Sequence, residues 1–179
     1  MDPRLEEVRR TIRSYPDFPK KGILFRDVLP VFHNPDIFRK LVDILAEQVQ
    51  SSVPDVSAVV GIEARGFIIA PALALALNVA FVPVRKPGKL PGTVKSQAYT
   101  LEYGEDTLEV QDDGFLKGGK VVIVDDLIAT GGDMQATISL LRSVGATVSL
   151  CMVIVELEEL NGRQKVTAPF YSLEKLPAS

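Results

Sequence analysis

Hydrophobic residues follow two different spacings along this chain of 179 residues. Near the N-terminus, apolar positions recur every three or four residues, which predicts one amphipathic helix over 2–13 and a second one that begins at Pro35. Asp2 and Asn34, each followed by a proline, are typical N-caps for these helices. The stretch between the helices, YPDFPKKGILFRDVLPVF, is rich in Pro and Phe and predicts irregular structure.

From Ser57 onward, short β-branched and apolar runs alternate with segments of helical spacing. The runs predict strands over 57–62, 80–84, 120–124 and 147–155, and the other segments predict helices over 67–78 and 132–144. Alternating strands and helices imply right-handed crossovers and a mainly parallel sheet with helices on both faces, which is an α/β fold. In such sheets, ligands bind at the carboxyl ends of the strands.

The alternation of strands and helices fails between Lys86 and Gly119, where the chain is polar and rich in Gly and Pro. The pieces TLEY and TLEV alternate polar and apolar residues, which predicts a small antiparallel excursion. Long insertions in compact domains are usually functional. We therefore expect a flexible loop over 87–108 that acts as a mobile lid.

Composition and charge narrow the class of protein. With 46% hydrophobic and 24% charged residues, the chain suits one globular domain over 1–179. A single cysteine, Cys151, excludes a disulfide framework and favours a reducing compartment. The sequence has no apolar run of 18 residues and no secretory signal, and its net charge of -3 gives no general attraction to nucleic acid. We expect a soluble, cytoplasmic protein with no nucleic-acid or membrane partner.

The segment VVIVDDLIATGGD, Val121 to Asp133, carries the most distinctive chemistry. Asp125 and Asp126 fall where a buried strand is expected to leave the sheet, and adjacent like charges are costly unless a ligand or cation uses them. The vicinal hydroxyls of a ribose can donate one hydrogen bond to each carboxylate, and Mg2+ on those hydroxyls would gain from the negative field. The following Ala-Thr-Gly-Gly exposes backbone N–H groups at a helix start, as in a phosphate cradle. The alternative is an acidic strand end and a glycine turn with Asp133 as an ordinary N-cap.

Among phosphate-binding motifs, one family fits this segment. The Walker spacing in GIEARGF has Phe67 in place of the required lysine, and no G-x-G-x-x-G occurs. A hydrophobic strand, two acidic residues and A-T-G-G resemble the phosphoribosyl diphosphate motif of type I phosphoribosyltransferases. Three further stretches, YPDFPKKGILFRDVLPVF, VVGIEARGFI and VRKPGKLPG followed by LEYG, narrow the resemblance to the adenine phosphoribosyltransferases over roughly Tyr15 to Tyr171.

This resemblance implies a type I phosphoribosyltransferase fold with an N-terminal hood over 1–34, a core over 35–179 and a flexible catalytic loop. It implies purine salvage, in which the phosphoribosyl group of 5-phosphoribosyl 1-diphosphate is transferred to N9 of adenine, giving AMP and pyrophosphate. Mg2+ would be carried mainly by the diphosphate and hydroxyls of the substrate. A homodimer is also implied, with Lys86 and Lys89 approaching the diphosphate across the interface.

The resemblance also assigns the ribose and phosphate sites. Asp125 and Asp126 would hold the ribose hydroxyls. Five consecutive residues would cradle the 5′-phosphate: Ala129, Thr130, Gly131, Gly132 and Asp133. Pyrophosphate would meet the Glu63-Ala64-Arg65 loop and four basic residues: Arg65, Arg85, Lys86 and Lys89. Taken alone, the last three of these would be an ordinary solvated basic loop.

For adenine, the resemblance assigns Leu24, Phe25 and Arg65. Backbone groups of Leu24 would bind the amidine edge, and Phe25 would pack against the ring, although it could equally be plain core. A backbone donor and acceptor match N1 and N6 of adenine, whereas a 6-oxopurine presents the opposite pattern and leaves buried groups unpaired.

Glu102, in the LEYG stretch, matches the proposed general acid/base of the family, and Tyr103 would help to close the lid. Taken alone, Glu102 would more often be an exposed glutamate without a function. The transition state should develop oxocarbenium character at the ribose, so positioning and charge stabilisation should dominate catalysis.

Asp133 departs from the family pattern, which more often has Thr or Ser after T-G-G. A carboxylate about 4 Å from a phosphate charge would cost on the order of 4 kcal/mol at an effective dielectric constant near 20. We therefore expect Asp133 to turn away from the phosphate and cap the helix, while backbone N–H groups bind the phosphate.

Two alternative functions stay open at this point. One is a phosphoribosyltransferase for another base, such as a 6-oxopurine, against which the GILF stretch argues. The other is a non-catalytic sensor that binds phosphoribosyl diphosphate and regulates a partner. The presence of Glu102, Arg85 and Lys89 favours catalysis.

Overall fold

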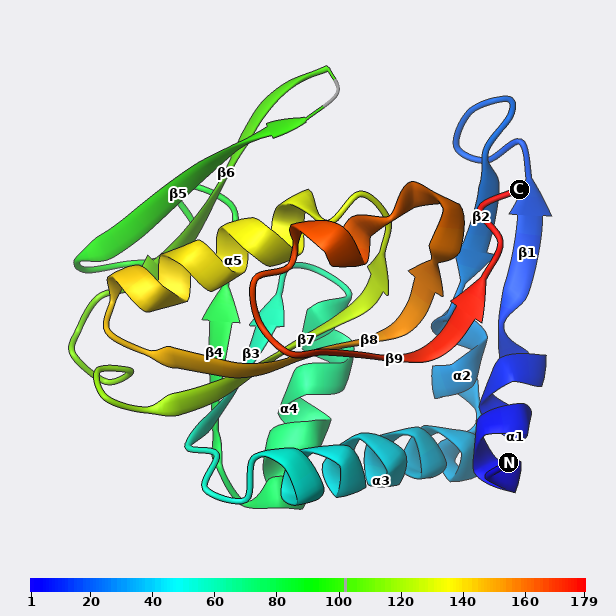
Figure 1. Cartoon of the computed structure of the whole chain (residues 1–179), viewed down its shortest axis with the longest axis horizontal. Coiled ribbons are helices and arrows are strands. Elements are labelled where there is room, and N and C mark those ends of the chain that lie inside the picture. The colour runs from blue at the N-terminus through cyan, green and yellow to red at the C-terminus, as the bar shows by residue number, and fades with distance from the viewer. Residues whose placement is uncertain (102) are drawn as a thin grey trace.

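A five-stranded parallel sheet forms the centre of the protein in the computed structural model, which describes residues 1–101 and 103–179 (Figure 1). Its strands, in order across the sheet, are β4 (Ala80–Val84), β3 (Ala58–Ile62), β7 (Lys120–Ile128), β8 (Thr147–Leu157) and β9 (Phe170–Leu176). Every neighbouring pair is parallel. The predicted α/β fold with a parallel sheet is confirmed.

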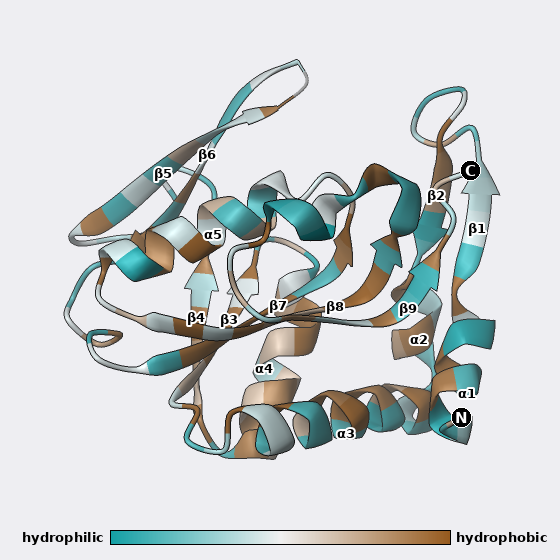
Figure 2. Cartoon of the chain, in the orientation of Figure 1, coloured by the Kyte–Doolittle hydropathy of each residue, from teal (hydrophilic) through white to brown (hydrophobic). Residues whose placement is uncertain are grey.

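Three helices cover the two faces of this sheet: α3 (Pro35–Ser52), α4 (Gly66–Leu77) and α5 (Gly132–Ser143). Along β7, Val122 and Val124 belong to the core shared with α3 and α4, whereas Val121 and Ile123 belong to the core shared with α5. This alternation is the two-residue period of a strand, and burial on both faces explains the uninterrupted apolar run (Figure 2). Among the described residues, no helix has the length and apolar content needed to cross a bilayer.

The N-terminal segment contains two helices and a two-stranded sheet: α1 (Pro3–Thr11), β1 (Arg13–Pro16), β2 (Leu24–Asp27) and α2 (Leu29–His33). The expectation of irregular structure is therefore wrong for β1 and β2, which pair antiparallel with Tyr15 opposite Phe25. Val8 and Val28 are buried in the core shared with α3. The guanidinium of Arg26 donates to the carbonyl oxygen of Pro177 at 2.7 Å, so the C-terminal end of the chain also attaches to this sheet.

The predicted antiparallel excursion is confirmed as the hairpin β5 (Val94–Leu101) and β6 (Gly104–Gln111). Leu108 and Val110 of this hairpin are fully buried in the core shared with α5. Helix α5 therefore lies between the central sheet and the hairpin (Figure 1). Motion of the hairpin as a lid stays a prediction.

Strand β7 is longer than predicted, and its extra length matters for the site. The strand continues to Ile128, so Asp125 and Asp126 lie within it and not beyond its end. Pairing with β3 stops at Val124, whereas pairing with β8 continues to Ile128. The two carboxylates therefore lie where β7 has lost one neighbour and gained an open side.

Candidate functional site

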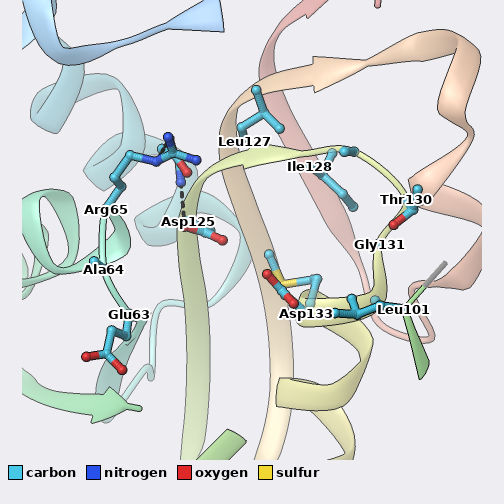
Figure 3. Close-up of a pocket in the computed structure, with 14 residues that line it drawn as sticks. Glu63, Ala64, Arg65, Leu101, Asp125, Leu127, Ile128, Thr130, Gly131 and Asp133 are labelled. Carbon is cyan, nitrogen blue, oxygen red and sulfur yellow. Dashed lines mark hydrogen bonds and ion pairs between the residues drawn. The ribbon is translucent and has the colours of Figure 1, made fainter. Parts of the chain in front are cut away.

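The residues that the sequence singles out meet at the carboxyl edge of the sheet, where β3 and β7 lead into α4 and α5. Ligands of parallel sheets bind at this edge. A cavity of about 240 Å³ opens there (Figure 3). It is lined by Glu63, Ala64, Arg65, Leu101, Asp125, Asp126, Leu127, Ile128, Ala129, Thr130, Gly131, Gly132, Asp133 and Met134.

Arg65 joins the loop after β3 to the second carboxylate of β7. Its Nε lies 2.7 Å from Oδ2 of Asp126, whose side chain is only 4% exposed. A buried carboxylate without a partner would be strongly destabilising, so this ion pair fixes both side chains. The side chain of Arg65 is 45% exposed and lines the cavity, where it can also meet an anionic ligand.

The adjacent carboxylates of β7 resist ionisation together. Burial, followed by the charge of Asp126, raises the pKa of Asp125 well above its ordinary value. Burial also raises the pKa of Asp126, although the charge of Arg65 opposes this effect. The amide of Asp126 donates to Oδ1 of Asp125 at 2.9 Å. Because ionisation is costly here, a ligand that brings hydroxyl donors or a cation gains from this pair.

The predicted phosphate cradle lies between β7 and α5. Gly131 is the N-cap of α5 and has φ of 86°, a conformation that favours glycine. The first helical hydrogen bond runs from the amide of Gln135 to the carbonyl of Gly131, so the amides of Gly132, Asp133 and Met134 precede it. These three residues line the cavity. The start of α5 thus offers the amide groups and helix dipole that bind phosphate.

Asp133 is the second residue of α5 and not its N-cap, so the predicted capping role is wrong. The reason is local: the helix begins after Gly131, two residues before Asp133, so Asp133 already lies in the first turn. Asp133 instead lines the cavity beside the hydroxyl of Tyr99 on β5. Burial, followed by the neighbouring carboxylate of Asp133, raises the pKa of Tyr99, and the Tyr99 hydroxyl donates to Oδ2 of Asp106 at 3.2 Å.

The basic segment after β4 is held by carboxylates. Arg85 Nη2 donates to Oε1 of Glu63 at 2.7 Å, and the amide of Lys86 donates to Oε2 of the same carboxylate at 2.7 Å. These contacts, with that of the Lys86 amide largest, lower the pKa of Glu63. The ammonium of Lys86 pairs with Asp106 on the hairpin. Within the described residues, Arg85, Lys86 and Lys89 lie outside the cavity lining, next to Glu63, which belongs to it.

The predicted adenine residues lie on β2, next to Arg65. The guanidinium carbon of Arg65 is 5.7 Å from the centre of the Phe25 ring, and Phe18 packs edge-on against the same ring at 5.1 Å. A second cavity, of about 390 Å³, is lined by Tyr15, Phe18, Phe25, Asp27 and Leu29. Leu24 pairs with Pro16, which has no amide proton to give to the Leu24 carbonyl. Arg65 therefore connects the carboxylates to the apolar surface of the hood.

Two predicted residues, Glu102 and Tyr103, follow Leu101 in the sequence. Glu102 lies outside the described residues. Tyr103 is 89% exposed, and Leu101 is the hairpin residue that reaches the cavity lining. Tyr99 and Asp106, opposite each other in the hairpin, were not predicted. Their only signal was the alternation of polar and apolar residues, from which the register of the two strands cannot be read.

Known proteins resemble this chain over most of its length. Residues 29–177 match the phosphoribosyl transferase domain family. The adenine phosphoribosyltransferase of Eremothecium gossypii is 44% identical over 170 residues, which cover 94% of this chain and 91% of the relative. That of Pelodictyon phaeoclathratiforme is 47% identical over 169 residues, which cover 94% of this chain and 96% of the relative.

A solved structure is similar over nearly the whole chain. It is the adenine phosphoribosyltransferase of Saccharomyces cerevisiae, complexed with D-2,5-dideoxy-2,5-imino-altritol 1,6-bisphosphate and adenine. The TM-score is 0.94 and the sequence identity is 42%, with 97% of this chain and 100% of the other covered. The likeness therefore includes the hood, the sheet and the hairpin.

The raised pKa of Asp125 predicts that this side chain weakens the fold at neutral pH. We expect Asp125→Asn to raise the free energy of unfolding at pH 7, because a neutral amide avoids the cost of ionising a buried side chain beside Asp126. A carboxyl with a raised folded-state pKa loses stability as the pH rises through that pKa, so the gain should shrink as the pH falls toward the ordinary aspartate range. Denaturant unfolding at several pH values measures this.

Asp43→Asn is the matched control for Asp125→Asn, since Asp43 is exposed on α3. Its effect should stay within about 0.5 kcal/mol at every pH. An Asp125→Asn variant that is less stable than the parent at pH 7 would contradict the electrostatic argument.

Proposed function

Because this chain belongs to the adenine phosphoribosyltransferases, within the phosphoribosyl transferase domain family, we propose how its own residues divide the work of that reaction. The activity is purine salvage: the phosphoribosyl group of 5-phosphoribosyl 1-diphosphate is transferred to N9 of adenine, giving AMP and pyrophosphate. A bond forms between N9 and C1′ while the bond from C1′ to the diphosphate oxygen breaks. The proton of the adenine ring must leave in the same reaction.

The observation that carries the proposal is one cavity that contains both a pair of carboxylates and a helix start. Asp125 and Asp126 accept hydrogen bonds from the ribose hydroxyls, which relieves the cost of keeping both side chains ionised. The amides at the start of α5 hold the 5′-phosphate, together with Thr130. These two contacts fix the sugar between them, so that C1′ has one position relative to the base.

Pyrophosphate binds at the loop of Glu63, Ala64 and Arg65, with Arg85 of the same chain nearby and with Lys86 and Lys89 supplied by the neighbouring subunit. Glu63 supports this assignment because it holds Arg85 and the amide of Lys86 at the edge of the cavity. Mg2+ enters with the substrate, and when bound it neutralises charge on the departing diphosphate. The carboxylate pair fits such a cation, because a nearby positive charge lowers the cost of ionising Asp125 and Asp126.

Adenine lies against Phe25, with Arg65 close to both the base and the ribose site. Backbone groups of Leu24 select adenine, and the absence of an amide proton on the paired Pro16 supports this role for the Leu24 carbonyl. A 6-oxopurine reverses the donor and acceptor pattern and leaves two buried groups unpaired, each of which costs about 1–3 kcal/mol.

Four further assignments complete the proposal. Glu102 handles the ring proton of adenine, and Tyr103 helps to close the hairpin over the site. The working form is a homodimer in which Lys86 and Lys89 approach the diphosphate of the neighbouring subunit. The protein acts in the cytoplasm.

The direct test is formation of AMP from 5-phosphoribosyl 1-diphosphate and Mg2+, with adenine, hypoxanthine, guanine and orotate offered in parallel. We expect product with adenine and at most about 1% of that rate with the other bases, since one unpaired buried group costs roughly 1–3 kcal/mol and two are unpaired in a 6-oxopurine. Equal rates with hypoxanthine would reject the role of Leu24. Binding of phosphoribosyl diphosphate without turnover of any base would favour a sensor.

Replacing the proposed general acid/base tests the role of Glu102. Glu102→Gln should lower kcat by about 100-fold or more, the usual range for proton transfer by a positioned side chain, with little change in the affinity for phosphoribosyl diphosphate. Glu105→Gln is the control, because Glu105 is exposed on the same hairpin. A kcat for Glu102→Gln that equals the parent value would remove Glu102 from the mechanism.

The carboxylate of Asp133 should oppose a bound 5′-phosphate. At about 4 Å and an effective dielectric constant near 20, the repulsion is on the order of 4 kcal/mol, so Asp133→Thr should tighten binding of phosphoribosyl diphosphate at least about tenfold. Asp36→Thr is the matched control, because Asp36 is also the second residue of a helix, α3, away from the site. Titration calorimetry compares the two, and unchanged affinity in Asp133→Thr would contradict the repulsion.

A further inference from the structure

The phosphate loop, residues 129–131, lies in direct backbone contact with a turn that is distant in sequence. This turn is the short helix η2 (Gly162–Lys165), which lies with η1 (Glu158–Leu160) between β8 and β9. A Cβ atom on Gly162 would come closer than 3.0 Å to the carbonyl oxygen of Ala129, a separation that real Cβ atoms do not reach. A Cβ atom on Gly131 would in turn meet the carbonyl oxygen of Gly162 equally closely. The two segments therefore pack with no room for a methyl group between them.

We propose that Gly162 is a positioning residue for the 5′-phosphate site. By presenting bare backbone to Ala129 and Gly131, it sets the position of the loop whose amides precede α5. This inference rests on the proposed function and extends it, because it names a residue that lies outside the cavity lining among the described residues and acts through the loop.

The two glycines of this contact are required for different reasons. Gly131 has a positive φ, so a side chain there would be strained whatever the space around it. Gly162 has no positive φ and its backbone conformation suits any residue. The need for glycine at 162 therefore comes from the contact with the phosphate loop alone. Substitution at 162 tests that contact without a change in backbone preference.

A strong ion pair anchors the turn behind the loop. Arg163 donates from Nε to Oε1 of Glu156 at 2.9 Å and from Nη2 to Oε2 at 2.6 Å, a bidentate arrangement. Nη2 also lies 3.2 Å from the hydroxyl oxygen of Ser172, and the guanidinium carbon is 4.7 Å from the centre of the Phe170 ring. Since Glu156 is on β8 and the other two residues are on β9, the central sheet fixes the residue next to Gly162.

The segment that follows this turn is bonded to α5, the helix after the phosphate loop. The amide of Thr167 donates to Oε1 of Gln135 on α5 at 2.9 Å, and Arg142 donates to the carbonyl of Thr167 at 2.8 Å. The sheet, α5 and η2 therefore enclose the loop from three sides. A loop held in this way presents its amides without a reorganisation cost when phosphate binds.

The test compares two ligands that use different loops. Gly162→Ala should displace the carbonyl of Ala129 and weaken binding of ribose 5-phosphate at least about tenfold, which is roughly 1.4 kcal/mol or the loss of one charge-assisted hydrogen bond. Pyrophosphate, which we place at residues 63–65, should keep its affinity within about twofold, since no contact of that loop involves residue 162 in the described chain. Titration calorimetry with each ligand measures both, and steady-state kinetics should show a higher KM for phosphoribosyl diphosphate.

Gly119→Ala is the matched control. Gly119 also lacks a positive φ, and a Cβ atom there would lie 2.6 Å from the hydroxyl oxygen of Ser57. It precedes Lys120 at the start of β7, at the opposite end of that strand from the carboxylates. This variant should lower the free energy of unfolding and leave the affinity for ribose 5-phosphate unchanged. If lower stability alone weakened ribose 5-phosphate binding, Gly119→Ala would weaken it as well. A loss of affinity in Gly162→Ala only therefore indicates a displaced phosphate loop.

A second variant decides the question if Gly162→Ala does not fold. Arg163→Lys keeps the charge and loses the bidentate geometry, so it should weaken ribose 5-phosphate several-fold and spare pyrophosphate. The inference is overturned if the parent protein makes AMP and a folded Gly162→Ala variant binds ribose 5-phosphate with parental affinity. If Gly162→Ala does not fold, parental affinity in Arg163→Lys overturns it. A parent protein that makes no AMP and binds no ribose 5-phosphate would instead overturn the proposed function.

Discussion

The ion pair between Arg65 and Asp126 is the contact on which the arrangement of the site depends. It joins the loop after β3 to a carboxylate that is nearly inaccessible to water. Removing Arg65 would leave the buried carboxylate of Asp126 without its partner, which is among the most destabilising changes that a core can undergo. The same guanidinium lies near Phe25, so one side chain relates the N-terminal segment, the loop after β3 and the carboxylates of β7 to one another.

Basic side chains near this site are paired with carboxylates. Because the whole chain has a net charge of -3, the positive charge that an anionic ligand meets must come from such local residues. Arg85 is paired with Glu63, and Lys86 is paired with Asp106. A diphosphate that binds nearby must compete with these carboxylates for their cations. The cost of that exchange favours a ligand that brings its own cation, because the anion then needs less charge from the protein. The carboxylates of β7 also favour a ligand that brings a cation, because the cation offsets the cost of keeping these desolvated side chains ionised.

Much of the fold was predictable because its signals are local in sequence. Two-residue and 3.6-residue periods located α1, α3, α4, α5 and four of the five central strands to within a few residues, whereas the five-residue helix α2 was missed in a stretch expected to be irregular. Strands β1, β2 and β9 escaped prediction because β1 and β2 are four residues long in a stretch rich in proline, and β9 mixes polar and apolar residues at a sheet edge. The carboxylates and the glycine turn were recognised from residue order alone. The contacts of Tyr99 and Asp106 depend on hairpin register, which residue order does not encode.

Gly162 marks the limit of such prediction more clearly than any strand. Its backbone conformation suits any residue, so nothing in its immediate sequence requires glycine there. The requirement arises only when β8, η2 and β9 return the chain to the back of the phosphate loop. The glycines of A-T-G-G, by contrast, were identified as a motif because their conformation and their neighbours are set within a few residues. A site of this kind therefore has two layers. The residues that face the ligand can be predicted from the sequence, whereas those that hold them in place are defined by tertiary contacts alone.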